Sequence, residues 1–367
     1  MRLFVSSSIL IIFIILNKNV FSLSNDYKLS ILKKGLDQPW SISFINKNEI
    51  LISEKTGKIK LFNQTNGSII EIKHNLSFIE DINSQGGLLE ILYHDDHVYI
   101  SYSEKRGEFK LYGPSSTSIA KAKFNKEKLN FYNIFRSEPP IRSPYHFGSR
   151  IVIKDNYLFA SLGERGKGMI AQEADKHPGS IIRINLDGSV PKDNPHFKDQ
   201  PLWLPEIFQI GVRNPQGMAI SLKKNKIFFS QHGPRGGDNI GILKKGGNYG
   251  WKDVAWGGTE YYGGKIGTKP FKKKYHLPII SWVPSIGVGQ INFYSGETFS
   301  EWNDNLIVSA SKAGLLLRLI LKENKVTHQE IILDKQVGRI RDFEIDINGD
   351  IYLIIDDENS SLWKLSK

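Results

Sequence analysis

Ile50-Leu51-Ile52-Ser53 is a short apolar run that ends in serine, and this phrase recurs along the 367-residue chain. The four further complete copies are Val98-Tyr99-Ile100-Ser101, Leu158-Phe159-Ala160-Ser161, Ile227-Phe228-Phe229-Ser230 and Leu306-Ile307-Val308-Ser309. A sixth copy, Ile351-Tyr352-Leu353-Ile354, lacks only the serine. A polar turn precedes each copy, and another apolar run precedes each turn. An all-β unit that recurs about every 45 to 80 residues predicts a β-propeller of six blades.

The repeat also predicts how the blades are built and how the ring closes. We expect an all-β, six-bladed β-propeller with four-stranded antiparallel blades, because a blade cannot bury its faces alone. Residues 27–33 alternate apolar and polar side chains before the first full blade. We expect this N-terminal strand to pair with residues 361–365 of the last blade, which closes the ring and removes an open edge. Residues 23–367 would then form a single domain.

Residues 1–22 have the composition of a signal peptide. Arg2 supplies a minimal charged region, and Ser8–Leu16 is an apolar stretch too short to span a bilayer comfortably. Val20-Phe21-Ser22 offers small residues for a signal peptidase, and an uncleaved anchor is the alternative. The chain has no cysteine, which excludes a disulfide framework and a thiolate metal site. We expect a periplasmic protein with no stable membrane insertion after cleavage.

The chain is basic. It carries 49 Lys and Arg residues against 38 Asp and Glu, a formal net charge of +11. A basic balance suits an anionic ligand, an anionic membrane surface or nucleic acid. Secretion and the lack of a clustered basic helix or an RNP-type motif argue against nucleic acid, so we expect no nucleic-acid partner.

Polar side chains gather just before the first strand of the blades. In a propeller the innermost strands begin at one mouth of the central channel, so these openings converge there. Lys312 follows a repeated strand that runs antiparallel to the innermost one and so ends at the same mouth. The residues that the repeat brings together are Gln85, His146, Arg213, Asn214, Lys312, Arg339 and Arg341.

Four members of this set are cations, and no carboxylate pair accompanies them, which disfavours glycoside hydrolysis. Four cations would repel one another unless an anion lies among them, and arginine side chains bind carboxylates bidentately. We therefore expect a polyanionic ligand that carries carboxylates, with His146 able to act as a base.

Seven phrases, in this order along the chain, resemble those of the soluble pyrroloquinoline-quinone sugar dehydrogenases, the glucose/sorbosone dehydrogenase group. The phrases are Gln85-Gly86-Gly87-Leu88-Leu89, His146 with Arg150, Arg213-Asn214-Pro215-Gln216-Gly217, His232-Gly233-Pro234, Gly246-Gly247-Asn248-Tyr249-Gly250-Trp251, Ser311-Lys312-Ala313-Gly314 and Arg339-Ile340-Arg341-Asp342. The resemblance runs from Gly35 to Lys364 and looks closest to the periplasmic aldose sugar dehydrogenases. It implies a six-bladed propeller with pyrroloquinoline quinone at the mouth of the channel.

The resemblance also implies roles for single residues. His146 would take the proton from the anomeric hydroxyl of an aldose while hydride passes to the quinone, and Glu164 would be the partner of this His. Arg213 would polarise a quinone carbonyl. The other implied positions are Gln85 and Asn214 at the ring system and substrate, Lys312, Arg339 and Arg341 at the cofactor carboxylates, and the main-chain carbonyls of Gly233 and Pro234 at a Ca²⁺ that acts as a Lewis acid.

Three positions depart from the family's pattern. Tyr145 stands where the family often has Asp before the catalytic His, and Glu164 stands where it has the Asp partner of that His. Asn239 replaces a carboxylate that relatives use at a further, structural calcium site. We therefore expect a cofactor-linked Ca²⁺, structural calcium that is weak or absent, and a monomer.

Other functions remain open. A propeller hydrolase such as a lactonase needs side-chain carboxylates and Asn around a channel metal, whereas this mouth is cationic. A non-catalytic propeller that binds a small anionic or sugar ligand would keep the same fold. Residues 251–282 carry several aromatic side chains that serve either packing or a lid or sugar-stacking surface. No motif identifies the preferred sugar or the periplasmic electron acceptor.

Overall fold

The structure, a computed structural model, describes residues 27–76, 85–107, 113–197 and 199–367. Within these ranges no helix is long and apolar enough to cross a membrane. The predicted signal peptide at residues 1–22 lies outside the described residues, so it stays a prediction.

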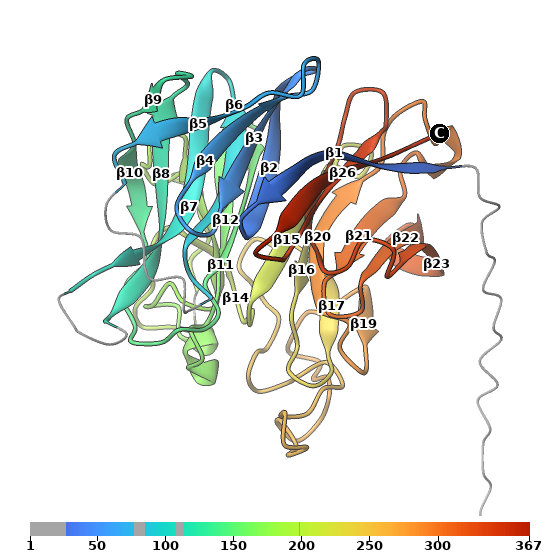
Figure 1. The fold of residues 1–367 in the computed structure, drawn as a ribbon. Coiled ribbons are helices and arrows are strands. Elements are labelled where there is room, and N and C mark those ends of the chain that lie inside the picture. Colours follow the sequence, from blue (N-terminus) through green and yellow to red (C-terminus); the bar gives the residue numbers. More distant parts are fainter. Residues whose placement is uncertain (1–26, 77–84, 108–112, 198) are drawn as a thin grey trace, which may run out of the picture.

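Six sheets stand around one axis as the blades of a propeller (Figure 1). The first blade consists of β2 (Pro39–Asn46), β3 (Glu49–Glu54), β4 (Ile59–Asn63), β5 (Ile69–His74) and β9 (Lys128–Leu129). The second consists of β6 (Leu88–His94), β7 (His97–Lys105), β8 (Ser115–Lys123) and β10 (Tyr132–Arg136). The third consists of β11 (Gly148–Lys154), β12 (Tyr157–Leu162), β13 (Ser180–Asn185), β14 (Ile207–Ile210) and β18 (Gly247–Asn248). The fourth blade consists of β15 (Pro215–Ser221), β16 (Lys226–Gln231), β17 (Asp238–Ile242) and β19 (Ile280–Trp282). The fifth consists of β20 (Val288–Phe293), β21 (Leu306–Ala310), β22 (Leu315–Lys322) and β23 (Lys325–Asp334). The sixth consists of β24 (Ile340–Ile345), β25 (Ile351–Ile355), β26 (Ser360–Ser366) and the N-terminal β1 (Lys28–Leu36). Two short 3-10 helices, η1 (Gly168–Gln172) and η2 (Ser300–Trp302), complete the described elements. The prediction of an all-β, six-bladed propeller is confirmed.

Two blades depart from the predicted four antiparallel strands. A short fifth strand joins the outer edge of the first blade, where β9 pairs with β5 in parallel. In the third blade β18 pairs with β14 in the same way. Both extra strands come from later parts of the chain and cover an edge that would otherwise be open.

The recurring serine joins one blade to the next. The first strands of neighbouring blades pack against one another around the axis. Ser53 Oγ donates a hydrogen bond to the carbonyl of Leu89 in the next blade at 2.6 Å, and Ser101 Oγ donates to Ser149 O at 2.7 Å. Each hydroxyl also accepts a backbone N–H from the innermost strand of its own blade, as Ser53 does from Ser41. Ser230 makes the same link to Gly289 in the next blade, whereas Ser309 donates to Gln290 in its own blade. The serine of the repeated phrase is thus an inter-blade hydrogen-bond link in three blades.

The sixth blade makes this link with a different residue. Ile354 pairs with Asp342 across β25 and β24, where the other blades place their serine. Asp342 Oδ2 accepts the backbone N–H of Ile42 in the first blade at 2.9 Å. A buried carboxylate therefore joins the last blade to the first.

The N-terminal strand closes the ring, as predicted. β1 pairs with β26 in antiparallel register from Lys28 opposite Ser366 to Leu36 opposite Ser360. The pairing places the first and last described strands side by side in one sheet (Figure 1).

The aromatic residues of segment 251–282 include a buried pair and an exposed pair. Trp251 and Trp256 are buried and stack with ring centroids 5.7 Å apart, so they serve packing. Tyr261 and Tyr262 are 69% and 85% exposed.

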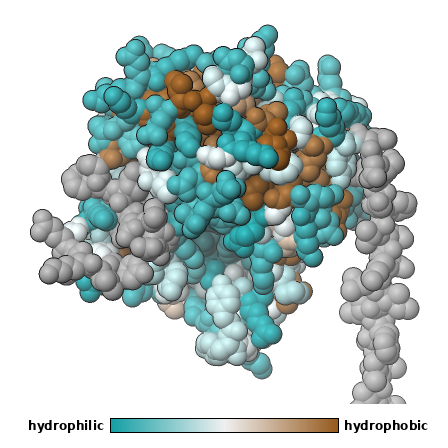
Figure 2. Space-filling model, viewed as in Figure 1, coloured by the Kyte–Doolittle hydropathy of each residue, from teal (hydrophilic) through white to brown (hydrophobic). Residues whose placement is uncertain are grey.

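Hydrophilic side chains cover most of the face in Figure 2, with the apolar ones in smaller patches between them.

Candidate active site

A cavity of about 300 Å³ opens at one end of the channel. We call this end the near mouth and define it by Gln85, Asn214, Arg339 and Arg341, which line the cavity. The other predicted side chains lie beside lining residues in the chain: His146 precedes Phe147, Arg213 precedes Asn214, and Lys312 follows Ser311. The convergence inferred from the repeat is therefore present in the fold.

His146 and Glu164 form the central pair of the site. The Nδ1 atom of His146 lies 2.5 Å from Oε1 of Glu164, so a proton on Nδ1 is donated to this carboxylate. The other carboxylate oxygen of Glu164 accepts the backbone N–H of Gly168 at 2.8 Å. Both side chains are largely buried. With Nδ1 committed, Nε2 of the neutral imidazole is the atom left to accept a proton.

The local backbone explains how this pair forms. His146 has φ of 55° and Ser149 has φ of 97°, conformations that L-residues rarely adopt. A Cβ atom at Gly163 would lie 2.0 Å from the carbonyl oxygen of His146, so only glycine allows the two segments to approach. Glu164 follows directly and lies against the imidazole. The longer arm of Glu is thus accommodated where the family's pattern has Asp.

Electrostatics keep the pair in the states that a base requires. Burial lowers the pKa of His146 from its ordinary value of 6.5, and the Arg213 charge adds to this, while the hydrogen bond to Glu164 acts in the other direction. Burial alone would raise the pKa of Glu164, but the interaction with His146 and the Gly168 N–H hold it below its usual value. At neutral pH the imidazole is neutral and the carboxylate is ionised.

Arg213 lies near the His146–Glu164 pair and contacts the His232-Gly233-Pro234 corner. It is 4% exposed, its Nη1 donates to the carbonyl of His232 at 3.3 Å, and its guanidinium lies over the ring of Trp251. Its Nε is buried and has no hydrogen-bond partner among the described residues. A buried donor without a partner is costly, so a ligand with acceptor oxygens would satisfy it.

Arg339 and Arg341 meet a carboxylate that the sequence analysis did not identify. Asp356 Oδ2 lies 3.2 Å from Nη2 of Arg339 and also pairs with Arg341. Burial would raise the pKa of Asp356, but the Arg341 and Arg339 charges hold it below its usual range. The Nε of Arg341 is buried and unpartnered in the described part of the chain. The near mouth is therefore less positive than the sequence suggested.

Gln85 and Asn214 shape the turn that carries His146. Gln85 Oε1 accepts the backbone N–H of His146 at 2.9 Å, and Asn214 Oδ1 accepts that of Gly148 at 3.0 Å. Both side chains line the cavity. Lys312 is exposed and makes no ion pair with the described residues. All three remain candidates for ligand contacts.

The Gly233-Pro234 corner, whose carbonyls the resemblance assigned to calcium, is held by Asp238 and does not line the cavity. Asp238 Oδ1 accepts the N–H of Gly233 at 2.8 Å, and its Oδ2 accepts those of Gly287 and Val288. The carbonyls of Gly233 and Pro234 accept no hydrogen bond from any described residue. Among the described residues, no group of three carboxylate or imidazole side chains could hold a metal ion. A cation here would depend on carbonyl oxygens and on oxygens that a ligand brings.

Asn239, where relatives have a carboxylate, is fully buried in β17. It accepts a hydrogen bond from Gln231 at 3.2 Å and donates one to the carbonyl of Gly237 at 2.9 Å. Its side chain therefore has a structural use in this chain.

Several residues of the site were missed by the sequence analysis. The missed residues that line the cavity are Lys55, Asp356 and His232, which was quoted in a phrase but given no role. Each of them follows the end of a repeated strand by one to three residues, as the predicted Lys312 and Glu164 do. Position after the repeated strand is therefore the signal that could have identified them. Burial lowers the pKa of His232 to about 4, with the Arg213 charge acting in the same direction, so this imidazole is neutral at pH 7.

Arg150 closes the channel beneath the cavity. It is 1% exposed, its Nη1 lies 2.8 Å from both Glu90 and Asp342, and its Nε donates to the carbonyl of Gln216 at 2.7 Å. Its guanidinium also stacks over Trp40, which lines the near mouth, at 4.4 Å from the ring centroid. One side chain thus joins five of the six blades.

The comparisons with known proteins agree with this geometry. The aldose sugar dehydrogenase YliI of Escherichia coli K12 is 32% identical over 354 residues, which span 92% of each chain. The crystal structure of the soluble aldose sugar dehydrogenase of Escherichia coli in its apo-form has a TM-score of 0.86 at 30% identity, covering 93% of this chain and 99% of that one. The quinoprotein glucose dehydrogenase B of Acinetobacter calcoaceticus is 25% identical over 427 residues, 93% of this chain and 87% of that protein.

A family model described as glucose/sorbosone dehydrogenase matches residues 36–364, nearly all of the described chain. The match includes every residue of the near mouth and both members of the His146–Glu164 pair. On the model match and the identity to its relatives, the chain belongs to the glucose/sorbosone dehydrogenase family.

Proposed function

We propose that this protein is a periplasmic quinoprotein that oxidises aldose sugars at the anomeric carbon to lactones. The observation that carries the proposal is the hydrogen bond between His146 and Glu164 beside a cavity lined by Arg339 and Arg341. A relative over most of the chain bears the name aldose sugar dehydrogenase, and another is named a quinoprotein. Together they point to pyrroloquinoline quinone as the ligand of the near mouth.

The near mouth fits a carboxylate-bearing quinone. Its lining combines two guanidinium groups with amide side chains, and the cavity volume of about 300 Å³ is that of a small cofactor site. The unpartnered Nε atoms of Arg213 and Arg341 would find acceptors in such a ligand. Lys312, Arg339 and Arg341 would meet its carboxylates, while Gln85 and Asn214 would contact its ring system with their amide groups.

The residues of the chain then have distinct tasks. Nε2 of His146 takes the proton of the anomeric hydroxyl as the C1–H leaves as hydride, and Glu164 stabilises the imidazolium that forms. Arg213 would direct its positive charge toward a carbonyl of the cofactor. The bound quinone would supply a hydride acceptor, and Ca²⁺ held at the Gly233-Pro234 carbonyls would supply Lewis-acid polarisation.

Calcium would be held by the carbonyl oxygens of Gly233 and Pro234. Ca²⁺ takes about six to eight oxygen ligands, so cofactor and water would supply the rest. Because Asn239 offers no carboxylate, we propose that structural calcium near it is weak or absent and that the protein is a monomer. Metal analysis and the mass in solution of the holoprotein test this; a calcium-dependent dimer with two or more tightly held ions per chain would refute it.

The same proposal covers the rest of the chain. Residues 1–22 would be removed as a signal peptide, and residues 23–367 would act as one catalytic domain without stable membrane insertion. A periplasmic electron acceptor, not identified by any feature of the site, would reoxidise the cofactor.

Reconstitution tests the function directly. Purified protein is titrated with pyrroloquinoline quinone and Ca²⁺, and reduction of a redox dye is followed with a panel of aldoses. We expect reduction that requires quinone, Ca²⁺ and sugar together. Quinone binding without sugar-dependent reduction would indicate a non-catalytic binding propeller. Hydrolysis of lactones without quinone would indicate a lactonase.

A further inference from the structure

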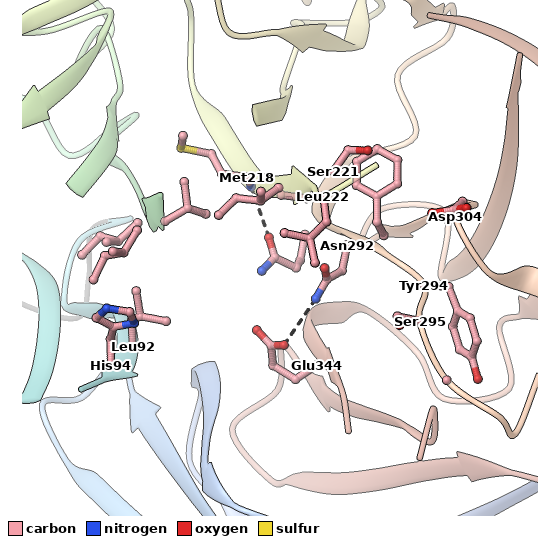
Figure 3. Close-up of a pocket in the computed structure, with 18 of the residues that line it drawn as sticks. Leu92, His94, Met218, Ser221, Leu222, Asn292, Tyr294, Ser295, Asp304 and Glu344 are labelled. Carbon is pink, nitrogen blue, oxygen red and sulfur yellow. Dashed lines mark hydrogen bonds between the residues drawn. The ribbon is translucent and has the colours of Figure 1, made fainter. Parts of the chain in front are cut away.

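A second, larger cavity opens at the opposite end of the channel. Its volume is about 760 Å³, and it lies where the innermost strands end, so we call this end the far mouth. Figure 3 shows side chains of several blades pointing into it, with Met218 and Leu92 on two sides and Glu344 facing Asn292. None of the residues proposed for the sugar reaction lines this cavity.

The lining of the far mouth is divided between apolar and polar side chains. The apolar part is supplied by the second to the fifth blade and includes Leu92, Ile151, Ile153, Met218, Ile220 and Phe293. A pocket of several hundred Å³ that combines an apolar surface with polar groups has the form of a small-molecule site.

The polar lining consists of carboxyl groups, amides, hydroxyls and the imidazole of His94. Glu90 and Glu344 are its more buried carboxyl groups, and Asp342 lies close to both in β24. In the described structure Arg150 is the one cation paired with these three groups, and its ion pairs are with Glu90 and Asp342. Glu344 makes no ion pair there and accepts one long hydrogen bond, 3.3 Å from the amide of Asn292 (Figure 3). Three carboxylates therefore share one positive charge.

The pKa values of these carboxyl groups are raised, so their protonated forms are favoured until a cation lies beside them. Burial raises the pKa of Glu344 well above its usual value, and the Asp342 and Glu90 charges add to this. Burial also raises the pKa of Glu90 to about 8 despite the opposing Arg150 charge. Ionised carboxylates in such a place are costly unless a positive group joins them.

A metal ion is not the best occupant. No three carboxylate or imidazole groups in the described ranges are placed to hold one. The apolar walls around Glu344 instead suit a ligand with a hydrocarbon body, and a carboxylate suits an N–H donor that carries the positive charge.

We propose that the far mouth binds a small organic cation, a primary amine with an apolar body, whose ammonium group lies against Glu344 and Glu90 and whose body fills the space between Met218, Ile220 and Leu92. This site is independent of the sugar reaction proposed for the near mouth. Its existence can be tested on the protein without quinone or sugar.

The test compares two ligands of equal shape. Cyclohexylmethylamine and cyclohexylmethanol differ in charge but have nearly the same apolar body. Isothermal titration of the wild-type protein is expected to give at least tenfold tighter binding of the amine, since a hydrogen bond to a charged group is worth about that factor or more. Equal binding of the two ligands, or binding of neither, would overturn the proposal.

Variants then locate the amine. Glu344→Gln keeps the shape of the site and is expected to weaken amine binding about tenfold or more while leaving the alcohol unchanged. Glu297→Gln removes a carboxylate from the exposed rim of the same cavity and serves as the matched control, with an expected change below about twofold. Ile220→Trp fills the cavity and should abolish binding of the amine. Wild-type affinity in Glu344→Gln or in Ile220→Trp would refute the placement.

Discussion

The two mouths lie at opposite ends of the innermost strands and carry opposite chemistry. At the near mouth, residues before and after the strands place cations and the His146–Glu164 pair around a cavity of about 300 Å³. At the far mouth, the ends of the same strands place carboxylates and apolar side chains around about 760 Å³. Arg150 and its two carboxylate partners lie between them. The repeat determines where side chains meet, and the residues at each end of a strand determine what they can bind.

Removing the base should have the largest effect on the near mouth. In His146→Ala we expect turnover with saturating sugar to fall by about 10²- to 10⁴-fold, because a positioned base is worth that much, while quinone still binds. Steady-state dye reduction and a cofactor titration measure the two quantities. His328→Ala, an exposed histidine on β23, is the control. A wild-type rate in His146→Ala would mean that another group is the base.

Arg150→Met tests the barrier between the mouths. Loss of this cation leaves Glu90 and Asp342 buried without their partner, which is expected to lower the free energy of unfolding by about 3–5 kcal/mol. Denaturant titration measures the change. Lys126→Met removes the partner of Glu49 in a more exposed pair and should cost about 1 kcal/mol or less. Equal losses in the two variants would show that the buried network has no special weight.

Arg339 and Asp356 should change cofactor affinity in opposite directions. Arg339→Ala is expected to weaken quinone binding about tenfold or more, because a charge-assisted hydrogen bond to a carboxylate is lost. Asp356→Asn removes the carboxylate that Arg339 and Arg341 meet in this structure, so it should strengthen binding. Fluorescence titration of both variants gives the two signs. Unchanged affinity in Arg339→Ala would remove this residue from the cofactor site.

The smallest expected effect is a shift in pH dependence. Because the pKa of His146 is lowered, kcat/KM should fall only on the acid side, as pH drops through a value below 6.5 and the imidazole takes up a proton. Glu164 acts to raise that pKa, so Glu164→Gln should move the acid limb to lower pH and reduce the rate less than His146→Ala does. An acid limb that stays in place would show that Glu164 is not the partner of His146.

The sequence predicted the architecture well because the architecture is periodic. The recurring apolar phrase identified six blades, and the alternation at residues 27–33 identified the closing strand. The fifth strands β9 and β18 were not predicted, since each is only two residues long and is defined by a partner far away in the chain.

The candidate site was predicted where a residue type stands out and missed where it does not. His146 and Glu164 meet as the resemblance implied. Asp356 escaped notice because a single acidic residue after a strand looks like any solvated turn, and only the fold shows that two arginines face it. The far mouth was also missed, because Glu90 and Glu344 stand in the middle of strands where their neighbours give no hint of a shared cavity.

The pairing of β1 with β26 sets a condition on how the chain can fold. Lys28 and Ser366, which lie opposite each other, are among the most distant residues of the described chain. A growing polypeptide makes β1 first and must wait for β26, so an early edge strand stays unpaired for the whole of synthesis. Contacts of such long sequence separation also form slowly. The proposed export would benefit from this delay, because the ring cannot close until its last strand has been made.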